Sequence, residues 1–373
     1  MTREAHISAI RRSLPAVVPP SLVQPAEIVP LVGDASSRSY YRVRVPHTAS
    51  SHLFPASVVV MAYPDEIAPG KELPFLNVHR YLRLAGIPVP DVLHHKPESR
   101  LLFLEDAGDT MLEDAVKKHG TTACLPMYEQ CIEVLVRIQA DGTRTLDGSA
   151  IPARLAFDMA KFGEEIDFFF EQAVRKYGGI RLSGSEERAI EDLFIPFLER
   201  TVSLPRVLTH RDYHSRNVMV LADTPAKPEK PGLRVLDYQD ARMGSVFYDL
   251  ASLLRDSYVT LAEEEEDHLK YVWRHLAHKE LLRAAGDPGA FTELLDAAAL
   301  QRNVKAIGTF GNQAHTRGKK LYLHFIPPTV ARLRSNFSRN PAMRPLSEKL
   351  LPLLEALAEK AMSETPSPEG TNS

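Results

Sequence analysis

Alternating apolar and polar positions mark the first hundred residues as a small antiparallel sheet. The segment IVPLVGDASSRSYYRVRV (28–45) predicts two strands joined by a turn, and SVVVMAY (57–63) predicts a buried third strand rich in β-branched residues. Between 71 and 86, apolar residues recur at helical spacing until a glycine closes the pattern. Two further strands follow in IPVPDVLHHKPESRLLFLED (87–106). This half of the pattern therefore predicts one helix packed on a small sheet.

Beyond Asp109 the apolar residues recur every three or four positions. They predict helices near 110–141, 155–177 and 184–200, and further helices from Tyr248 onward. One β interruption breaks this series, because RNVMVL and LRVLDY are apolar strands separated by a Pro/Lys-rich loop, which predicts a hairpin with a long tip. The acidic run EEEED at 263–267 predicts a solvated helix start, where acidic side chains suit the helix dipole.

Four segments follow from these patterns. They are an N-terminal helix with a Pro-punctuated connector (1–27), a β-rich N-lobe (28–107), a larger helical C-lobe (108–362) and a disordered tail (363–373). A small β lobe followed by a helical lobe with one inserted hairpin predicts an α+β, protein-kinase-like bilobal fold. A fold alone does not determine a function.

Composition and net charge argue against several classes of protein. The net charge of −3 argues against a nucleic-acid partner, and the apolar runs are too short to predict a membrane span. The N-terminus resembles no signal peptide, so we expect a cytoplasmic protein, and we expect it to be a monomer. Cys124 and Cys131 lie seven residues apart in a predicted helix, and this spacing favours two buried thiols over a disulfide or a metal site.

The segment VLTHRDYHSRNVMV contains most of the candidate catalytic and metal-binding residues. It places His210, Asp212 and Asn217 in the order H-x-D-x-x-x-x-N, and Asp237 follows after the predicted hairpin. Phosphoryl transfer requires a carboxylate that accepts the proton of the attacking hydroxyl and oxygen ligands that hold magnesium across the phosphates of ATP. Asp212 fits the first role, and Asn217 with Asp237 fits the second. The alternative is a polar turn whose side chains cap local backbone.

Together with GDASSRSYYRV, LLFLEDAGD and LDYQDARMGSVFYDLASLLRD, this stretch resembles the aminoglycoside phosphotransferase-like kinases, and among them the bacterial N-acetylmuramate/N-acetylglucosamine anomeric kinases. The likeness extends from about Gly33 to Leu333. It implies that Asp212 is the catalytic base, that Asn217 and Asp237 bind Mg²⁺, and that His210 and Arg211 support the catalytic loop. It also implies that Asp249 buttresses this loop, although the same residue in YDLASLL fits a helix N-cap.

The resemblance also locates a nucleotide site in the N-lobe. The turn GDASSR takes the place of a phosphate-binding loop, and LFLEDAGD takes the place of the hinge that meets adenine; the implied contacts are Gly33, Ser36, Ser37, Arg38, Leu104, Glu105 and Asp106. A plain hairpin turn and an acidic loop between lobes are the alternatives. The third strand, which usually supplies a lysine to the phosphates, has Met61 at its centre, so Arg38 and Arg42 become candidates for that cation.

The acceptor is expected to be a small hydroxylated molecule, since no APE-like segment follows Asp237 as in a protein kinase. Arg216, Gln239 and Asp240 are candidate acceptor contacts. The cluster His315, Arg317, Lys319 and Lys320 is either an anion site or a surface helix end. The leading hypothesis is a cell-wall amino-sugar kinase acting on an anomeric hydroxyl. Phosphorylation of an aminoglycoside or an amino alcohol, and a regulatory pseudokinase, are the alternatives.

Overall fold

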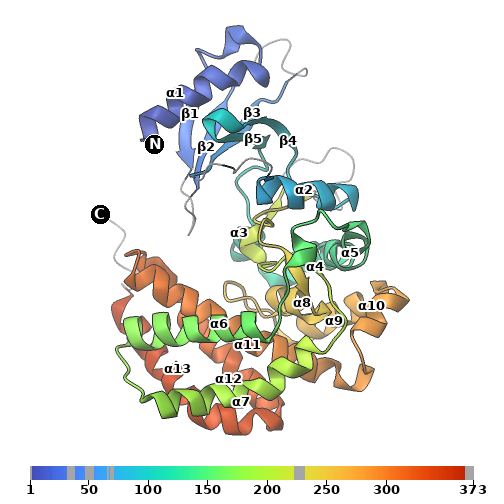
Figure 1. The fold of residues 1–373 in the computed structure, drawn as a ribbon, viewed down its shortest axis with the longest axis vertical. Helices are drawn as coiled ribbons and strands as arrows, with labels where there is room; N and C mark the ends of the chain where they lie inside the picture. The colour runs from blue at the N-terminus through green and yellow to red at the C-terminus, as the bar shows by residue number, and fades with distance from the viewer. Residues whose placement is uncertain are drawn as a thin grey trace.

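The structure is a computed structural model that describes residues 2–31, 38–46, 54–64, 67, 71–221 and 232–365. It has two lobes: a sheet with α1 lies at one end of the molecule, and a helical body lies at the other (Figure 1). The predicted bilobal α+β arrangement is confirmed. The turn at 32–37, the loop at 222–231 and the last part of the predicted tail (366–373) lie outside the described residues.

The N-lobe is built on a five-stranded antiparallel sheet in the order β1-β2-β3-β5-β4. The strands are β1 (Glu27–Leu31), β2 (Ser39–Arg44), β3 (Ser57–Ala62), β4 (Val92–Lys96) and β5 (Leu101–Glu105). Successive side chains of a strand face opposite sides of a sheet. On β3, Val58 and Val60 therefore join the apolar cluster that includes residues of α1 (Arg3–Ser13), whereas Met61 joins the cluster that includes residues of α2 (Pro74–Leu84). Helices thus cover both faces of the sheet, whereas the sequence predicted only one helix packed on it.

The C-lobe holds the remaining helices and two short strand pairs. The helices are α3 (Leu112–His119), α4 (Thr121–Arg137), α5 (Thr143–Thr145), α6 (Met159–Phe169), α7 (Gly184–Val202), α8 (Val246–Leu254), α9 (Glu263–Leu276), α10 (Lys279–Ala284), α11 (Phe291–His315), α12 (Ile326–Arg339) and α13 (Arg344–Glu364). A π-helical segment, Phe170–Gly178, continues α6. The helices at 110–141 were predicted as one, and the structure divides them at Gly120, whose φ of 83° is a backbone conformation that favours glycine.

Two short strand pairs position the polar loop that contains His210, Asp212 and Asn217. The predicted hairpin is confirmed as β7 (Val218–Val220) paired with β8 (Leu233–Val235). A second pair, β6 (Val207–Thr209) with β9 (Arg242–Gly244), was not predicted. The loop at 210–217 therefore runs from β6 to β7, and the segment at 236–241 runs from β8 to β9. The pairing brings these two loops to the same place in the C-lobe.

The long helix α11 is the central support of the C-lobe, and it packs closely against the π-helical segment. A Cβ atom on Gly311 would lie 2.8 Å from the Cα atom of Ala173 and 2.9 Å from the carbonyl oxygen of Gln172. Real Cβ atoms do not approach backbone atoms this closely, so only glycine fits here without moving a helix.

Replacing Gly311 with alanine is therefore expected to lower the free energy of unfolding by about 1–3 kcal/mol, because the added methyl group overpacks the contact. Urea unfolding followed by circular dichroism measures the change. Gly163→Ala in α6 is the matched control, since its Cβ would meet nothing within 4 Å. The control is expected to gain about 0.5–1 kcal/mol from helix propensity. Equal effects of the two substitutions would show that the close contact does not limit stability.

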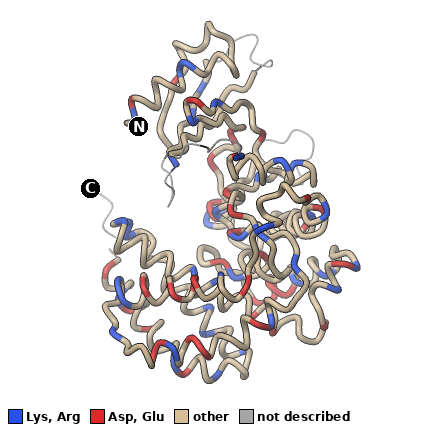
Figure 2. Tube along the Cα trace, in the orientation of Figure 1, with Lys and Arg blue, Asp and Glu red and all other residues tan. Residues whose placement is uncertain are grey.

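Charged residues of both signs are interspersed over both lobes (Figure 2). The acidic run at 263–267 begins α9 as predicted, but the prediction that it is solvated is wrong in part, because Glu265 and Glu266 are buried. Glu266 accepts hydrogen bonds from Arg255, and Glu265 accepts one from Thr122. Cys124 and Cys131 are buried free thiols. Among the described residues, no helix is both long and apolar enough to cross a membrane.

Candidate active site

The loop between β6 and β7 is held in a strained conformation by a buried carboxylate from α8. Arg211 has a φ of 85°, which is costly for a residue with a side chain. Asp249 is fully buried and accepts hydrogen bonds from the backbone N–H groups of His210 (2.6 Å) and Arg211 (3.0 Å). Burial raises the pKa of Asp249 to about 7, even though these two N–H groups favour its ionised form. The N-cap of α8 is Ser245, so the alternative role of Asp249 as a helix cap is wrong.

His210 connects this loop to the segment that follows β8. Its Nε2–H donates to the carbonyl oxygen of Leu236 at 2.8 Å, and its Nδ1 accepts from the backbone N–H of Asp212 at 3.3 Å. One nitrogen therefore donates and the other accepts, which describes a neutral imidazole. Burial lowers the pKa of His210, in agreement with that state. The histidine thus fixes the distance between the loop that carries Asp212 and the segment that carries Asp237.

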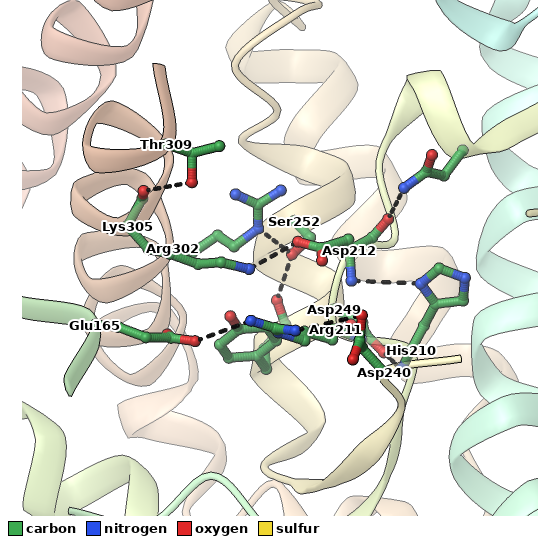
Figure 3. Close-up of polar contacts among 12 residues, drawn as sticks. Glu165, His210, Arg211, Asp212, Asp240, Asp249, Ser252, Arg302, Lys305 and Thr309 are labelled. Atoms are coloured by element: carbon green, nitrogen blue, oxygen red, sulfur yellow. Dashed lines mark hydrogen bonds and ion pairs between the residues drawn. The ribbon is translucent and has the colours of Figure 1, made fainter. Parts of the chain in front are cut away.

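Asp212 lies among three cations. The Nζ atom of Lys305 donates to Oδ1 of Asp212 at 2.8 Å, and Figure 3 shows that both side chains point toward each other across the site. Burial would raise the pKa of Asp212, but Lys305, Arg302 and Arg211 outweigh it and hold the pKa well below its usual range. The side chain remains 27% exposed. The site therefore presents an ionised carboxylate that an incoming hydroxyl group could reach.

Lys305 and Arg302 are functional candidates that the sequence reasoning missed. Both come from α11, which is buried along most of its length. Arg302 is itself buried, and its Nε donates to the hydroxyl oxygen of Ser252 at 2.7 Å (Figure 3). Lysine and arginine are rarely buried unless they are paired. No clear signal in the sequence marked either residue, because Arg302 and Lys305 lie among polar neighbours in QRNVK, a pattern that equally fits a solvated helix face.

Asn217 and Asp237 have the donor set that a magnesium ion prefers. The amide NH₂ of Asn217 donates to the carbonyl oxygen of Asp212 at 2.8 Å, so its amide oxygen points away from that carbonyl. Asp237 has a φ of 61° and its side chain is 49% exposed. Its Oδ1 accepts from Nε2 of Gln239 at 2.9 Å. One carboxylate and one amide oxygen facing a cavity fit a hard cation that keeps waters and phosphate oxygens as its other ligands.

Asp212, Asn217 and Asp237 line one cavity of about 390 Å³. Four basic residues and two carboxylates line its wall, and the basic residues are Arg211, Arg216, Arg302 and Lys305. Carboxylates behind the wall lie near two of these arginines. His214 also lines the cavity, and burial lowers its pKa well below the usual value, so it adds no charge. The cavity is therefore lined by more basic than acidic side chains, which favours phosphate groups and acidic or neutral acceptors over polycations.

Arg216 lines the cavity, as an acceptor contact requires. Its guanidinium carbon lies 4.9 Å from the ring centre of Tyr258 and 5.6 Å from that of Phe325, and its Nε lies 3.4 Å from Glu113. Gln239 and Asp240 do not line the cavity, since Gln239 donates to Asp237 and Asp240 lies 3.6 Å from Arg211. The cluster at 315–320 begins at the last residue of α11, is largely exposed and lies outside the cavity wall, as the surface alternative predicts.

Only some of the predicted phosphate-binding residues of the N-lobe lie in the part of the chain that the structure describes. Gly33, Ser36 and Ser37 lie outside the described residues, while Arg38 lies with its NH1 atom 4.0 Å from Oδ1 of Asp237. Arg42 is buried and donates to Asp106, Asp109 and the carbonyl oxygen of Gly108. It therefore ties the hinge to β2, and the suggestion that it binds phosphate is not supported by its position.

The hinge itself joins the two lobes through an ion pair. The carboxylate of Glu105 accepts hydrogen bonds from Arg234 of β8 at 2.7–3.1 Å, and the N–H of Glu105 donates to the carbonyl oxygen of Asp91. Leu104 is buried in the sheet. The Glu105 and Asp106 side chains are therefore engaged within the protein, and the prediction that adenine meets hinge backbone stays a prediction.

Comparisons with known proteins identify the family to which a chain with this cavity belongs. Residues 27–273 match the model of the phosphotransferase enzyme family, and the chain belongs to this family. It is an enzyme that transfers phosphate to a hydroxyl group of a small molecule. The N-acetylmuramate/N-acetylglucosamine kinase of Pseudomonas aeruginosa is 29% identical over 336 residues, which cover 89% of this chain and 90% of that protein. The enzyme of the same name from Neisseria meningitidis is 30% identical over 328 residues, covering 86% and 89%.

Solved structures confirm the kinase-like fold. The ethanolamine kinase of Plasmodium vivax superposes with a TM-score of 0.56 at 13% identity, covering 91% of this chain and 89% of that chain. An ADP-bound aminoglycoside phosphotransferase gives a TM-score of 0.53 at 13% identity, covering 90% and 94%. The predicted protein-kinase-like fold is therefore confirmed.

Proposed function

We propose that this enzyme uses Mg²⁺-ATP to phosphorylate the anomeric hydroxyl of an amino sugar, N-acetylmuramate or N-acetylglucosamine. The observation that carries the proposal is the ionised Asp212 on the wall of a cavity that it shares with Asn217 and Asp237. The names of the relatives that match across most of the chain support the choice of acceptor. Such an enzyme would act as a monomer in the cytoplasm and return cell-wall sugars to biosynthesis.

The chain's own residues supply the steps of transfer. Asp212 accepts the proton of the acceptor hydroxyl, and as an ionised carboxylate it is ready to do so without first losing a proton. Asp249 and His210 hold the loop so that this carboxylate faces the cavity. Catalysis of this kind is mainly positioning and electrostatic stabilisation.

Asn217 and Asp237 would hold the magnesium ion, which neutralises negative charge on the phosphate oxygens when bound. The hinge at 104–107 would meet adenine through its backbone, and Gly33, Ser36, Ser37 and Arg38 would meet the phosphates. Arg38 supports this assignment, because its guanidinium lies next to the proposed metal ligand Asp237.

The charge of the cavity argues for the acceptor class. An aminoglycoside is a polycation, and bringing it to a wall that carries four cations and two carboxylates costs free energy. N-acetylmuramate carries a carboxylate that the guanidinium groups of Arg216 or Arg302 can recognise. The cavity therefore favours an acidic or neutral sugar over an aminoglycoside or an amino alcohol.

Acceptor-dependent release of ADP, measured with four acceptors, tests this proposal. N-acetylmuramate and N-acetylglucosamine are expected to have kcat/KM values at least about 10²-fold above those of kanamycin and ethanolamine, because of the unfavourable charge of the latter two. The two sugars form a matched pair that differs by the lactyl carboxylate, so N-acetylmuramate is expected to have the lower KM. Preference for either amine would contradict the proposed acceptor class.

A further inference from the structure

The third strand of the N-lobe cannot supply the usual phosphate-binding cation. Met61 is fully buried in the apolar cluster that α2 joins, and Arg42 on β2 is engaged by the hinge carboxylates. The cations that meet the catalytic carboxylate instead come from α11. Lys305 lies there with its side chain 11% exposed, and Arg302 lies one turn before it.

Two cations of α11 lie beside the Asp212 carboxylate. Lys305 donates to Asp212, and Arg302 lies buried behind it, where it donates to the hydroxyl of Ser252 and also feels the charge of the buried Asp256. Arg211 lies 3.6 Å from Glu165 of α6 and 3.6 Å from Asp240, so it has carboxylates of its own. Desolvating cations is costly unless an anion compensates them. Among the described residues, Lys305, whose one carboxylate partner is Asp212, is therefore the cation on the cavity wall that a second anion can use.

We propose that Lys305 is a catalytic residue that binds the phosphoryl group during its transfer and supplies the positive charge that the third strand lacks. This inference rests on the proposed phosphotransfer to an acceptor hydroxyl at Asp212. The acceptor oxygen forms the new bond to phosphorus while the bond from phosphorus to the ADP oxygen breaks, and the hydroxyl proton passes to the Asp212 carboxylate. Lys305 stays protonated, and none of its covalent bonds forms or breaks. Its ammonium group donates hydrogen bonds to the phosphoryl oxygens.

The distances around Asp212 allow the ammonium group of Lys305 to contact the phosphoryl group. The acceptor oxygen must lie about 3 Å from the Asp212 carboxylate to pass its proton, and about 3–3.5 Å from phosphorus to attack it. A cation 2.8 Å from Oδ1 of the same carboxylate is therefore a neighbour of the reacting group. An ammonium on a flexible stem with three N–H donors can keep one bond to Asp212 and turn another to a phosphoryl oxygen.

The packing of α11 keeps Lys305 in place. One turn after Lys305, a Cβ atom on Gly308 would lie 3.0 Å from the Cα atom of Phe169, so α11 rests almost directly on α6. The Thr309 hydroxyl donates to the carbonyl oxygen of Lys305 at 3.1 Å (Figure 3). Positioning of this kind gives an electrostatic contact its catalytic value, since no reorganisation is needed when charge develops.

Lys305→Met tests the inference, with Lys320→Ala, an exposed lysine five residues after the end of α11, as the control. The Met variant is expected to lose about 10²–10³-fold in kcat for sugar phosphorylation, with KM values for ATP and acceptor within about threefold of wild type. Its melting temperature is expected to fall only slightly, because Arg302 and Arg211 still compensate the Asp212 carboxylate. In Lys305→Ala, added methylammonium is expected to restore part of kcat, and in Lys305→Arg the retained charge is expected to do the same.

Three results would overturn the assignment. The first is a kcat within about threefold of wild type in Lys305→Met. The second is a loss of kcat that an equal loss of folded protein at the assay temperature explains. The third is a loss of kcat that neither methylammonium nor the Lys305→Arg substitution reduces. The wild-type enzyme is the reference in every assay. If the wild-type enzyme transfers phosphate to neither sugar, the proposed function is wrong, and the inference that rests on it is rejected as well.

Discussion

Replacement of Asp212 by asparagine is expected to lower kcat by roughly 10²–10⁴-fold, the usual contribution of a general base. Asparagine has the same shape but cannot accept the proton of the acceptor hydroxyl. ATP binding is expected to persist, because the hinge and the proposed metal ligands are unchanged. Steady-state kinetics and equilibrium binding of a fluorescent ATP analogue measure the two quantities separately. Loss of ATP binding in this variant would show that Asp212 acts in nucleotide binding instead.

The same substitution is also expected to destabilise the protein, since it leaves Lys305 without its 2.8 Å carboxylate partner. Removing one partner of a largely buried charged pair costs about 1–3 kcal/mol. The double variant Asp212→Asn with Lys305→Met is expected to recover part of that stability, because no unpaired ammonium remains. Additive losses of stability in the double variant would contradict the coupling of the two side chains.

Replacement of Asp237 by asparagine is expected to lower kcat/KM by about 10²-fold or more at fixed magnesium, with a weaker apparent affinity for the metal. The substitution isolates the carboxylate, because asparagine has the same size and also tolerates the left-handed backbone found at Asp237, where φ is 61°. Titration of activity with magnesium measures the effect.

Asp192→Asn is the control for this experiment, since Asp192 is an exposed carboxylate on α7. It is expected to leave both the rate and the magnesium titration unchanged. If Asp237→Asn keeps the wild-type magnesium dependence, then Asp237 is not a metal ligand, and the site at the end of β8 needs another explanation.

The sequence predicted the features that depend on local pattern. Alternation gave the strands of the N-lobe, because a half-buried strand repeats every two residues. The spacing from His210 to Asn217 and the hairpin after it predicted the catalytic loop, since these residues lie close together in the chain. The strands β6 and β9 are as short as β7 and β8, but β9 has the sequence Arg-Met-Gly and so lacks the apolar run that marked the predicted hairpin.

Contacts between distant segments could not be read from the sequence. Lys305 meets Asp212 from 93 residues away, and Arg42 meets Asp106 and Asp109 across more than 60. A basic residue on a strand or helix looks the same in sequence whether it is solvated or buried against a carboxylate. Asp249 illustrates the same limit, because only the family resemblance linked it to the loop, while its place near the start of α8 equally fitted a cap; its hydrogen bonds to the loop decide between the two.

Phosphorus NMR of the reaction product tests the central claim most directly. Wild-type enzyme, Mg²⁺-ATP and N-acetylmuramate are expected to give a new phosphorus signal that is coupled to the anomeric proton of the sugar. Asp212→Asn at the same concentration is expected to give none over the same period. A phosphorus signal coupled to another position of the sugar would contradict anomeric phosphorylation, and an equal signal from the Asp212→Asn variant would contradict the role of Asp212 as the base.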